Sequence, residues 1–451
     1  MFPVDPGQKR SQVVFLGEKA MEKFFKLKEH GTDVKQELLA GLTTFLTMAY
    51  ILAVNPAMLG SIGNGMTPGP VFTATAITAG IASILMGLTA NLPVALAPGM
   101  GLNAFFTYTV VINMGYSWQL ALTAVFLEGI VFILISVLNF RRAIIEAIPR
   151  NLKKAVAVGI GLFIAFLGFT NSGIVVVGEG SILSIGELSK PFPMFAIVGL
   201  VLIMILYSIK MPGAVLTGIL TITLISIPMG VTKIPVGWTP FRAPAAPLFF
   251  RFEWSGVLSY KFFTVFFTFL FVDMFDTIGT LMGVCTQARL IDKNGNIPRV
   301  NRALLSDAIG TVLGAALGTS TVTSYIESST GIASGGKTGL TAVSTGFFFL
   351  LSLLLSPLFL LIPSSATAPA LIFVGFLMMA PVVDIDFSDP TEGLPCFLAI
   401  VMMPFANSIA DGMAYGILTY TLLKSATGRF KEIPVVTWVL FLVFIFRFFT
   451  R

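Results

Sequence analysis

The chain has little of what metal sites and soluble enzymes need. Its 451 residues include one histidine, His30, and two cysteines, Cys285 and Cys396. A single histidine ahead of the first apolar segment cannot form a histidine-based metal site, and cysteines within apolar sequence are typical of small buried side chains rather than of disulfides. Charged residues make up 11% of the chain, whereas about a quarter is usual in soluble domains. These shortages argue against a water-soluble enzyme.

Apolar residues take the place of the missing charge. They form 55% of the chain, and the mean hydropathy is +0.91, so a water-soluble fold of this size could not bury them all. Forty-three glycines and 25 prolines are scattered through the apolar runs, which indicates broken and closely packed membrane helices. Residues 1–34 are polar and lysine-rich, without a cleavable signal pattern. We therefore predict an all-α polytopic membrane protein.

Fourteen apolar segments predict about fourteen transmembrane spans, and one more apolar stretch forms an extra C-terminal hydrophobic segment. Several are shorter than the ~20 residues that an upright helix needs to cross a bilayer. Glycine and proline interrupt the third segment at 96–101 and flank the tenth, so spans 3 and 10 are predicted to be discontinuous. The segments are 37–58, 71–90, 94–111, 117–139, 152–170, 194–209, 213–230, 260–284, 301–318, 320–335, 339–362, 366–383, 394–409 and 411–426, followed by 434–449.

Basic residues predict the orientation of the chain in the membrane. They cluster in the N-terminal segment and after spans 4, 8 and 14, so we expect a cytoplasmic N-terminus in a cell (plasma or inner) membrane. We expect the acidic connection after span 12 on the opposite side. The loop at 231–261 should face out, yet it is basic. The last stretch ends in Arg447 and Arg451, so we expect it to lie in the interface or to re-enter. The cytoplasmic basic residues are Lys19, Lys23, Lys26, Lys28, Lys35, Arg141, Arg142, Arg150, Lys153, Lys154, Arg289, Lys293, Arg299, Arg302, Lys424, Arg429 and Lys431, and the acidic ones after span 12 are Asp384, Asp386, Asp389 and Glu392.

An internal repeat divides the spans into two halves. Residues 217–224 resemble 415–422, residues 122–125 recur at 340–343, and residues 44–46 recur at 268–270. Together these matches predict a 7+7 repeat. Because seven crossings are an odd number, the second half enters the membrane inverted, and span 3 then corresponds to span 10. Inverted repeats with discontinuous helices are typical of secondary transporters, with the binding site at the midplane.

Three acids, Asp273, Asp276 and Glu327, interrupt segments that otherwise suit hydrocarbon. A carboxylate at the bilayer centre costs at least ~2.5 kcal/mol, so such a group normally faces a cavity, a partner or a solute. For Asp273 and Asp276, the alternative is that they lie near a span end and are hydrated. Two other acids, Glu128 and Asp307, are expected to make structural hydrogen bonds between helices or, alternatively, to act directly in function. A further acid, Asp411, fits the N-terminus of a helix.

A nucleotide-binding pattern occurs at residues 331–338 (GIASGGKT), which fit the Walker A motif letter for letter. That loop requires a buried strand before it and a soluble domain around it, and the chain offers neither. We expect instead a flexible cytoplasmic turn with Lys337 at the interface. Active transport, if present, then draws on an ion gradient.

Long blocks of the chain resemble the AzgA-like purine permeases. The blocks are 37–48 (ELLAGLTTFLTM), 91–106 (NLPVALAPGMGLNAFF), 275–281 (FDTIGTL), 325–328 (YIES) and 335–343 (GGKTGLTAV). The resemblance implies a proton-coupled importer of hypoxanthine, guanine or adenine, without a cofactor and energised by the proton gradient. It implies a core domain that moves against a gate domain like an elevator. The implied partners are a purine nucleobase, protons, the lipid bilayer and a second copy of the chain in a homodimer, but no nucleic acid.

The same resemblance implies roles for individual residues. Glu327, Asp273, Asn103 and Tyr325 match positions that contact the base, and Asp276 matches the proton-coupling carboxylate. The uracil-type relatives have a histidine in span 8 that this chain lacks.

The chemistry of a purine suits these residues independently. A carboxylate accepts two parallel hydrogen bonds from the edge of a base, and an asparagine side chain both donates and accepts. The rings of Phe105, Phe106 and Tyr325 could stack on a base, although core packing is the ordinary role of phenylalanine in so apolar a chain.

We expect seven regions along the chain, and two other functions compete with purine transport. A carrier of inorganic or carboxylate anions with the same fold would need positive charge at its site, and a channel or membrane enzyme would need continuous pore helices or a catalytic constellation. The regions are a cytoplasmic segment (1–34), core spans 1–4 (35–140), gate spans 5–7 (141–232), an external linker (233–259), core spans 8–11 (260–362), gate spans 12–14 (363–430) and the C-terminal hydrophobic segment (431–451).

Overall fold

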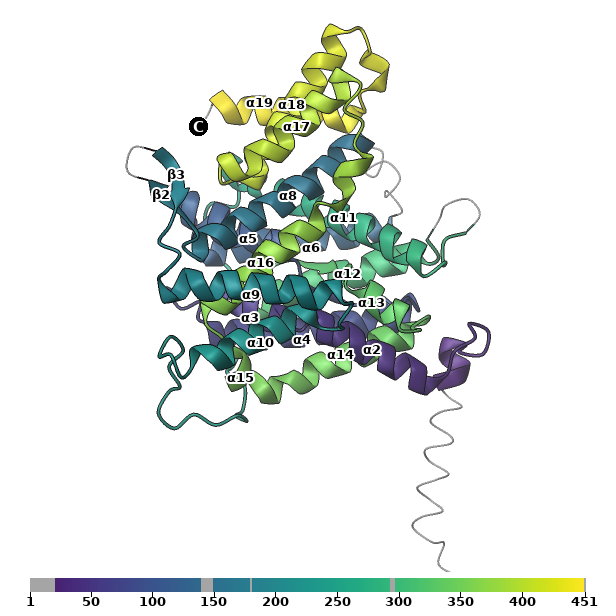
Figure 1. Cartoon of the computed structure of the whole chain (residues 1–451). Helices are drawn as coiled ribbons and strands as arrows, with labels where there is room; N and C mark the ends of the chain where they lie inside the picture. Colours follow the sequence, from purple (N-terminus) through teal and green to yellow (C-terminus); the bar gives the residue numbers. More distant parts are fainter. Residues whose placement is uncertain (1–20, 139–148, 179–180, 293–296, 450–451) are drawn as a thin grey trace, which may run out of the picture.

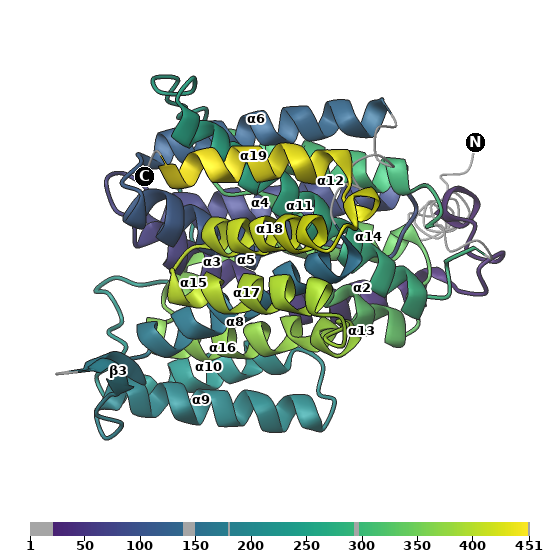
Figure 2. The ribbon, with the colours of Figure 1, turned by 90° about the horizontal axis from the view of Figure 1, so that it is seen from above.

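The computed structural model describes residues 21–138, 149–178, 181–292 and 297–449. Five basic residues that the orientation prediction names lie outside these ranges: Lys19, Arg141, Arg142, Lys293 and the C-terminal Arg451. Seen from above, the long helices lie roughly along one common axis (Figure 2), and some are tilted strongly against the others (Figure 1). The elements are α2 (Val34–Met48), α3 (Ile51–Gly60), α4 (Pro68–Thr89), β1 (Leu96–Pro98), α5 (Met100–Ala104), the π-helix η1 (Phe105–Asn113), α6 (Trp118–Val137), α8 (Arg150–Asn171), β2 (Val175–Gly178), β3 (Ser181–Ile185), α9 (Pro191–Ser208), α10 (Ala214–Ser226), α11 (Tyr260–Gln287), α12 (Val300–Leu317), β4 (Val322–Ser324), α13 (Ser328–Ala333), α14 (Gly339–Leu351), the 3₁₀ helix η2 (Ser352–Leu355), α15 (Ser356–Leu360), α16 (Ser364–Met378), the 3₁₀ helix η3 (Ala380–Asp384), α17 (Pro390–Phe405), α18 (Ile409–Ala426), the 3₁₀ helix η4 (Phe430–Glu432) and α19 (Val435–Phe449).

Eight helical segments of the described chain are long and apolar enough to cross a membrane, and three shorter apolar helices accompany them. The prediction of a helical membrane protein with many spans is therefore confirmed. The count of fourteen stays a prediction. The C-terminal helix α19 packs against α18. The expectation that this segment lies in the interface or re-enters stays a prediction.

Short strands occupy the two segments that were predicted to be interrupted. β1 lies in span 3 and β4 in span 10, and the two pair antiparallel, with Ala97 opposite Thr323. The pairing extends beyond the strands, because Gly99 N donates to the Thr321 carbonyl at 2.9 Å and Tyr325 N donates to the Ala95 carbonyl at 3.0 Å. Backbone groups inside a membrane protein must be paired, and each broken span satisfies the other. The fold is thus helical but not purely so; a hairpin of β2 and β3 lies at one end (Figure 1).

The helices pack in two sets. In the first, α4 lies against α3, α12 and α14, while α6 lies against α11 and α12. In the second, α8 lies against α16 and α17, while α9 lies against α10 and α16. The boundaries expected for a core and a gate domain follow the same division, but those domains stay a prediction.

Glycines allow the closest helix contact of the first set. A Cβ atom on Gly339 of α14 would lie 2.1 Å from the carbonyl oxygen of Gly87 on α4, and one on Gly346 would lie 2.5 Å from that of Gly80. Such distances are below any real Cβ contact, so a side chain at either position would force α4 and α14 apart. Small residues that let backbones touch are the usual means of packing helices in lipid.

The residues that resemble a Walker A loop surround a carboxylate of the chain itself. The Glu37 side chain is fully buried, and it accepts hydrogen bonds from Lys337 N at 2.9 Å, Thr338 N at 3.2 Å and Thr341 N at 3.2 Å. The Thr341 hydroxyl donates to the same group at 2.6 Å. These N–H groups open helix α14, where an anion is stabilised. The expected flexible turn is instead held in place, and Glu37 fills the position of an external anion.

Replacing Glu37 with alanine should lower the melting temperature of the protein strongly. The change leaves three buried N–H groups and one hydroxyl without an acceptor, and each unpaired group costs about 1–3 kcal/mol. Thermal unfolding in detergent measures the effect. The control is Glu29→Ala, because Glu29 is exposed and forms a surface ion pair with Lys26. Equal melting temperatures for the two variants would contradict the capping role of Glu37.

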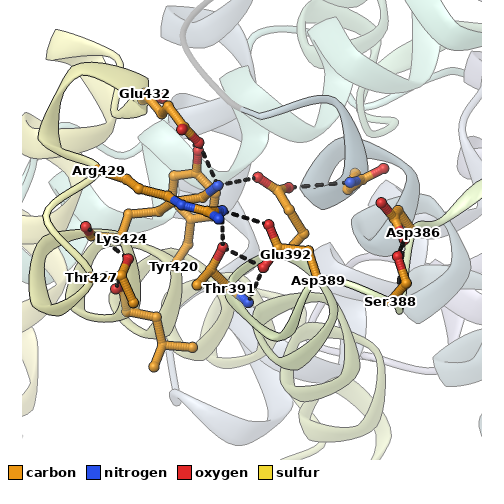
Figure 3. Close-up of polar contacts among 12 residues, drawn as sticks. Asp386, Ser388, Asp389, Thr391, Glu392, Tyr420, Lys424, Thr427, Arg429 and Glu432 are labelled. Carbon is orange, nitrogen blue, oxygen red and sulfur yellow. Dashed lines mark hydrogen bonds and ion pairs between the residues drawn. The ribbon is translucent and has the colours of Figure 1, made fainter.

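A charged cluster joins the connection after α16 to the end of α18 (Figure 3). Lys424 is 1% exposed, and its ammonium group lies 2.9 Å from Glu392 and 2.6 Å from Glu432. Arg429 lies 2.6 Å from Asp389. The backbone N–H and the hydroxyl of Thr391, together with Arg429, lower the pKa of Asp389 to about 2, so this ion pair persists in all but strong acid.

The cluster corrects the expected side of the acidic connection. Because α17 and α18 form an antiparallel pair, the chain leaves and returns to the same side of the molecule. The acidic residues Asp389 and Glu392 therefore meet the basic Lys424 and Arg429. On the same side, Lys154 at the start of α8 donates to the Asp384 carbonyl at 2.7 Å. The expectation that this acidic connection faces opposite to the basic ones is wrong.

Replacing Lys424 with methionine should destabilise the protein by up to about 3 kcal/mol, because it leaves two glutamates without their shared cation. This is the lower end of the range for broken buried pairs, since Glu432 is half exposed. The melting temperature in detergent measures it. The control is the same change at exposed Lys431, where a shift within the ordinary surface range of about 0.5 kcal/mol is expected. A neutral result at Lys424 would show that the cluster contributes nothing to stability.

Candidate functional site

Two of the predicted acids meet beside the crossing of β1 and β4. Glu327 directly precedes α13, and Asp276 lies in the middle of α11. The Asp276 carboxylate is hydrogen-bonded to the side chain of Thr323 in β4, and the charge of Glu327 acts on it. Both acids are half-buried. The strand crossing thus brings acids from two distant spans into one place.

Tyr50 completes this group, and the sequence analysis did not find it. It lies at the junction of α2 and α3, is 1% exposed, and donates its hydroxyl to Glu327 Oε1 at 2.6 Å. The hydrogen bond fixes the orientation of the carboxylate and leaves Oε2 as the acceptor for another donor. A signal was present, because a tyrosine inside an apolar span needs a partner for its hydroxyl. The sequence could not show which of the acids that partner is.

Tyr325 lies at this site but uses its hydroxyl for the fold. The hydroxyl donates to the Pro98 carbonyl of β1 at 2.6 Å, and the residue is 5% exposed. The charges of Glu327 and Asp276 both act on it. Tyr325 therefore fastens β4 to β1 next to the acids. Its predicted contact with a ligand stays a prediction.

Asn103 and Phe105 follow β1 and are fully buried. The Ser320 hydroxyl donates to Asn103 Oδ1, and Asn103 Nδ2 makes a long contact of 3.5 Å with the Pro98 carbonyl. The Phe105 ring packs edge to face on Phe269 of α11, with ring centroids 4.8 Å apart. In this conformation both side chains are engaged with the protein, and a role in contacting a ligand stays a prediction for each.

Asp273 lies in a second group of acids, deeper than the first. It is fully buried, as are Glu128 of α6 and Asp307 of α12. The charges of Asp307, Glu128 and Asp276 act on Asp273. The predicted hydrogen bonds of Glu128 and Asp307 are present: Thr321 donates to Glu128 at 3.5 Å and Thr277 donates to Asp307 at 3.0 Å. The prediction that Asp273 contacts a ligand would require this carboxyl group to be uncovered.

One face of α11 is open beyond Asp276. Gly279 and Gly283 follow on the same side of the helix and are exposed. A Cβ atom at Gly279 would meet no other atom within 4 Å, and one at Gly283 would meet only Ile326, the neighbour of Glu327. The open face runs toward the end of α11 at Gln287 and the basic connection that follows it, which is predicted to be cytoplasmic.

Comparison with known proteins gives a consistent result. The model of a permease family matches residues 35–414. The chain is 43% identical to adenine permease AdeQ of Escherichia coli over 413 residues, which cover 92% of each chain. It is 43% identical to guanine/hypoxanthine permease PbuG of Bacillus subtilis over 441 residues, which cover 95% of this chain and 99% of the relative.

Solved structures share the fold. The transmembrane domain of the cyanobacterial bicarbonate transporter BicA superposes with a TM-score of 0.63 at 18% identity, covering 83% of this chain and 96% of that one. SLC26A9 gives a TM-score of 0.61 at 11% identity, covering 95% and 73%. At identities this low, the similarity shows a shared fold and does not show which solute is transported.

Proposed function

The chain belongs to the permease family whose model its residues 35–414 match, and from that membership we propose that it is a secondary transporter that imports purine nucleobases by proton symport. It is a permease and not an enzyme. Relatives over nearly its whole length are named for adenine and for guanine and hypoxanthine. The single observation that carries the proposal is the pair of half-buried acids, Glu327 and Asp276, beside two crossed broken spans.

The chemistry of Glu327 suits an uncharged base. A purine presents N–H donors along its edge, and a carboxylate accepts them without a counter-charge on the ligand. Because the Tyr50 hydroxyl occupies Oε1, the incoming base meets a carboxylate that is already oriented. An anion would be repelled by Glu327 and Asp276, so the acidity of the site disfavours the alternative of an anion carrier with the same fold.

Architecture supports an inverted repeat and an elevator-like movement. β1 and β4 belong to spans 3 and 10, which the repeat relates to each other, and they cross where the acids lie. The first set of helices holds both strands, whereas the second set packs mainly within itself. We propose that these sets are the core and gate domains, that the N-terminus is cytoplasmic, and that the open face of α11 leads from the site to the cytoplasm.

Uptake of labelled adenine, guanine and hypoxanthine into energised vesicles tests the proposal directly. We expect accumulation that an uncoupler abolishes, because one proton moving through 100 mV supplies about 2.3 kcal/mol. Xanthine and uracil serve as competitors, and vesicles without the protein serve as the control. Uptake of bicarbonate instead of any purine would establish the anion-carrier alternative.

Replacing Glu327 with glutamine should weaken binding of the base strongly. The amide presents donors where the base also donates, and the loss of one charge-assisted hydrogen bond costs about 1.5–3 kcal/mol, or roughly 10- to 150-fold in affinity. Binding to purified protein measures the change, with Glu187→Gln as the control at an exposed position. Wild-type affinity in Glu327→Gln would remove this residue from the binding site.

Replacing Asp276 with asparagine should leave binding largely intact and abolish uphill uptake. Asparagine keeps a hydrogen-bonding partner for Thr323 but cannot take up a proton, so the variant equilibrates the base without concentrating it. Counterflow measures equilibration of the base across the membrane, and uncoupler-sensitive uptake measures its accumulation. The control is Asp386→Asn on the exposed connection before α17. Full accumulation by Asp276→Asn would show that the proton is handled elsewhere.

A further inference from the structure

Three acids of the first helix set lie in the interior, away from the half-buried site. Glu128 of α6, Asp273 of α11 and Asp307 of α12 are each 0% exposed. An isolated ionised carboxylate at such a depth is unfavourable unless donors or cations compensate its charge. The number of compensating partners therefore decides whether these groups are ionised.

Hydrogen-bond donors are too few for three carboxylates. The Thr277 hydroxyl serves Asp307 Oδ1 at 3.0 Å, and the Thr321 hydroxyl contacts Glu128 Oε2 at 3.5 Å. The remaining oxygens, Glu128 Oε1 and Asp307 Oδ2, receive none. No N–H or hydroxyl of the described residues donates to either oxygen of Asp273. Asp273 is thus a fully buried acid without a donor, and the neighbouring carboxyl with which it interacts is that of Glu128.

Compensating cations are also missing from this part of the structure. Among the described residues, the charges that act on the three acids come from other acids, including Asp276. Helix α8 brings Lys153 over the ring of Phe275 at 5.3 Å, a different face of α11 from that of Asp273, and α18 brings Asp411 at its first turn. The described acids, histidines and cysteines form no group of three that could hold a metal ion.

Two carboxylates cannot hydrogen-bond to each other, because neither has a donor; a carboxyl and a carboxylate can, through one proton. We propose that Glu128 and Asp273 share a proton and form an internal proton-binding site that exchanges with Asp276. The inference rests on proton symport as the proposed function. One proton moves between carboxyl oxygens: Asp276 gives up the proton that the Glu128–Asp273 pair takes, and no other bond changes.

The position of the site gives it a connection to the base. Asp276 lies one helical turn from Asp273, and its carboxylate contacts Thr323. Two residues earlier, Thr321 contacts Glu128. The segment of Thr321 to Thr323 therefore touches the acids of both groups, and Glu327 follows four residues later. A change in the position of β4 when the base binds would alter the surroundings of both the proton and the base.

Infrared spectroscopy of the purified wild-type protein and of Glu128→Gln and Asp273→Asn tests the proposal without transport. A glutamine at 128 imitates a protonated glutamic acid, since its amide donates to Asp273, so the variant should fold normally. We expect the wild-type protein at neutral pH to show a carboxylic-acid C=O band that shifts in D₂O, and each variant to lose it. Melting temperatures close to that of the wild type confirm folding.

Glu37→Gln is the matched control, because Glu37 is equally buried but receives three N–H groups and a hydroxyl. These four donors satisfy its side chain, so its substitution should leave the band unchanged. A wild-type spectrum without a protonated-carboxyl band, or a band that persists in both cluster variants, overturns the shared proton.

Transport assays then test the exchange with Asp276. We expect Glu128→Gln, which changes no residue predicted to contact the base, to bind the base with wild-type affinity and to lose accumulation above equilibrium. Wild-type accumulation in this variant overturns the role in coupling. If wild-type protein neither binds nor accumulates a purine, the proposed function fails, while the infrared comparison still decides whether the pair holds a proton.

Discussion

The pairing of backbone groups where two broken spans cross is the constraint on which the rest of this structure depends. Inside a bilayer a chain that leaves the helical conformation must find partners for its N–H and C=O groups. β1 and β4 solve this for each other, and Tyr325 adds its hydroxyl to the Pro98 carbonyl. Because the solution requires residues from both halves of the chain, it also fixes Glu327 near Asp276. The site is a consequence of the pairing rather than an addition to it.

Local features of the sequence predicted much of this arrangement. Pro98 with two glycines closely behind it disfavours a continuous helix, so the interruption of span 3 could be predicted without a structure. A second local feature, an acidic residue within an apolar run, identified Asp273, Asp276 and Glu327. In contrast, the hydrogen bond between Tyr50 and Glu327 links residues 277 positions apart, and no periodicity reveals such a partner.

The errors have the same origin. The acidic connection at Asp389 and Glu392 was expected opposite the basic ones, although its side depends on how many helices cross before it and not on its composition. The Walker A resemblance at 331–338 identified a true anion-binding helix start, but the anion is Glu37 from a segment 300 residues away. Sequence patterns report what a segment can bind, whereas the fold decides which group of the chain reaches it.

Buried charge is treated in three different ways in this molecule, and the differences bear on function. Glu37 is surrounded by N–H groups at the start of α14, and Lys424 is placed between two glutamates. In both cases the buried charge has the hydrogen-bonding or ion-pair partners that it needs, as expected of groups that support the fold. The acids around Asp273 have neither donors nor cations in sufficient number. A proton is the remaining means of neutralising them, and a proton, unlike a helix N-terminus or a lysine, can leave. The incompletely satisfied cluster is therefore the place, among these three, where the charge can change, which is the property that a coupling site requires.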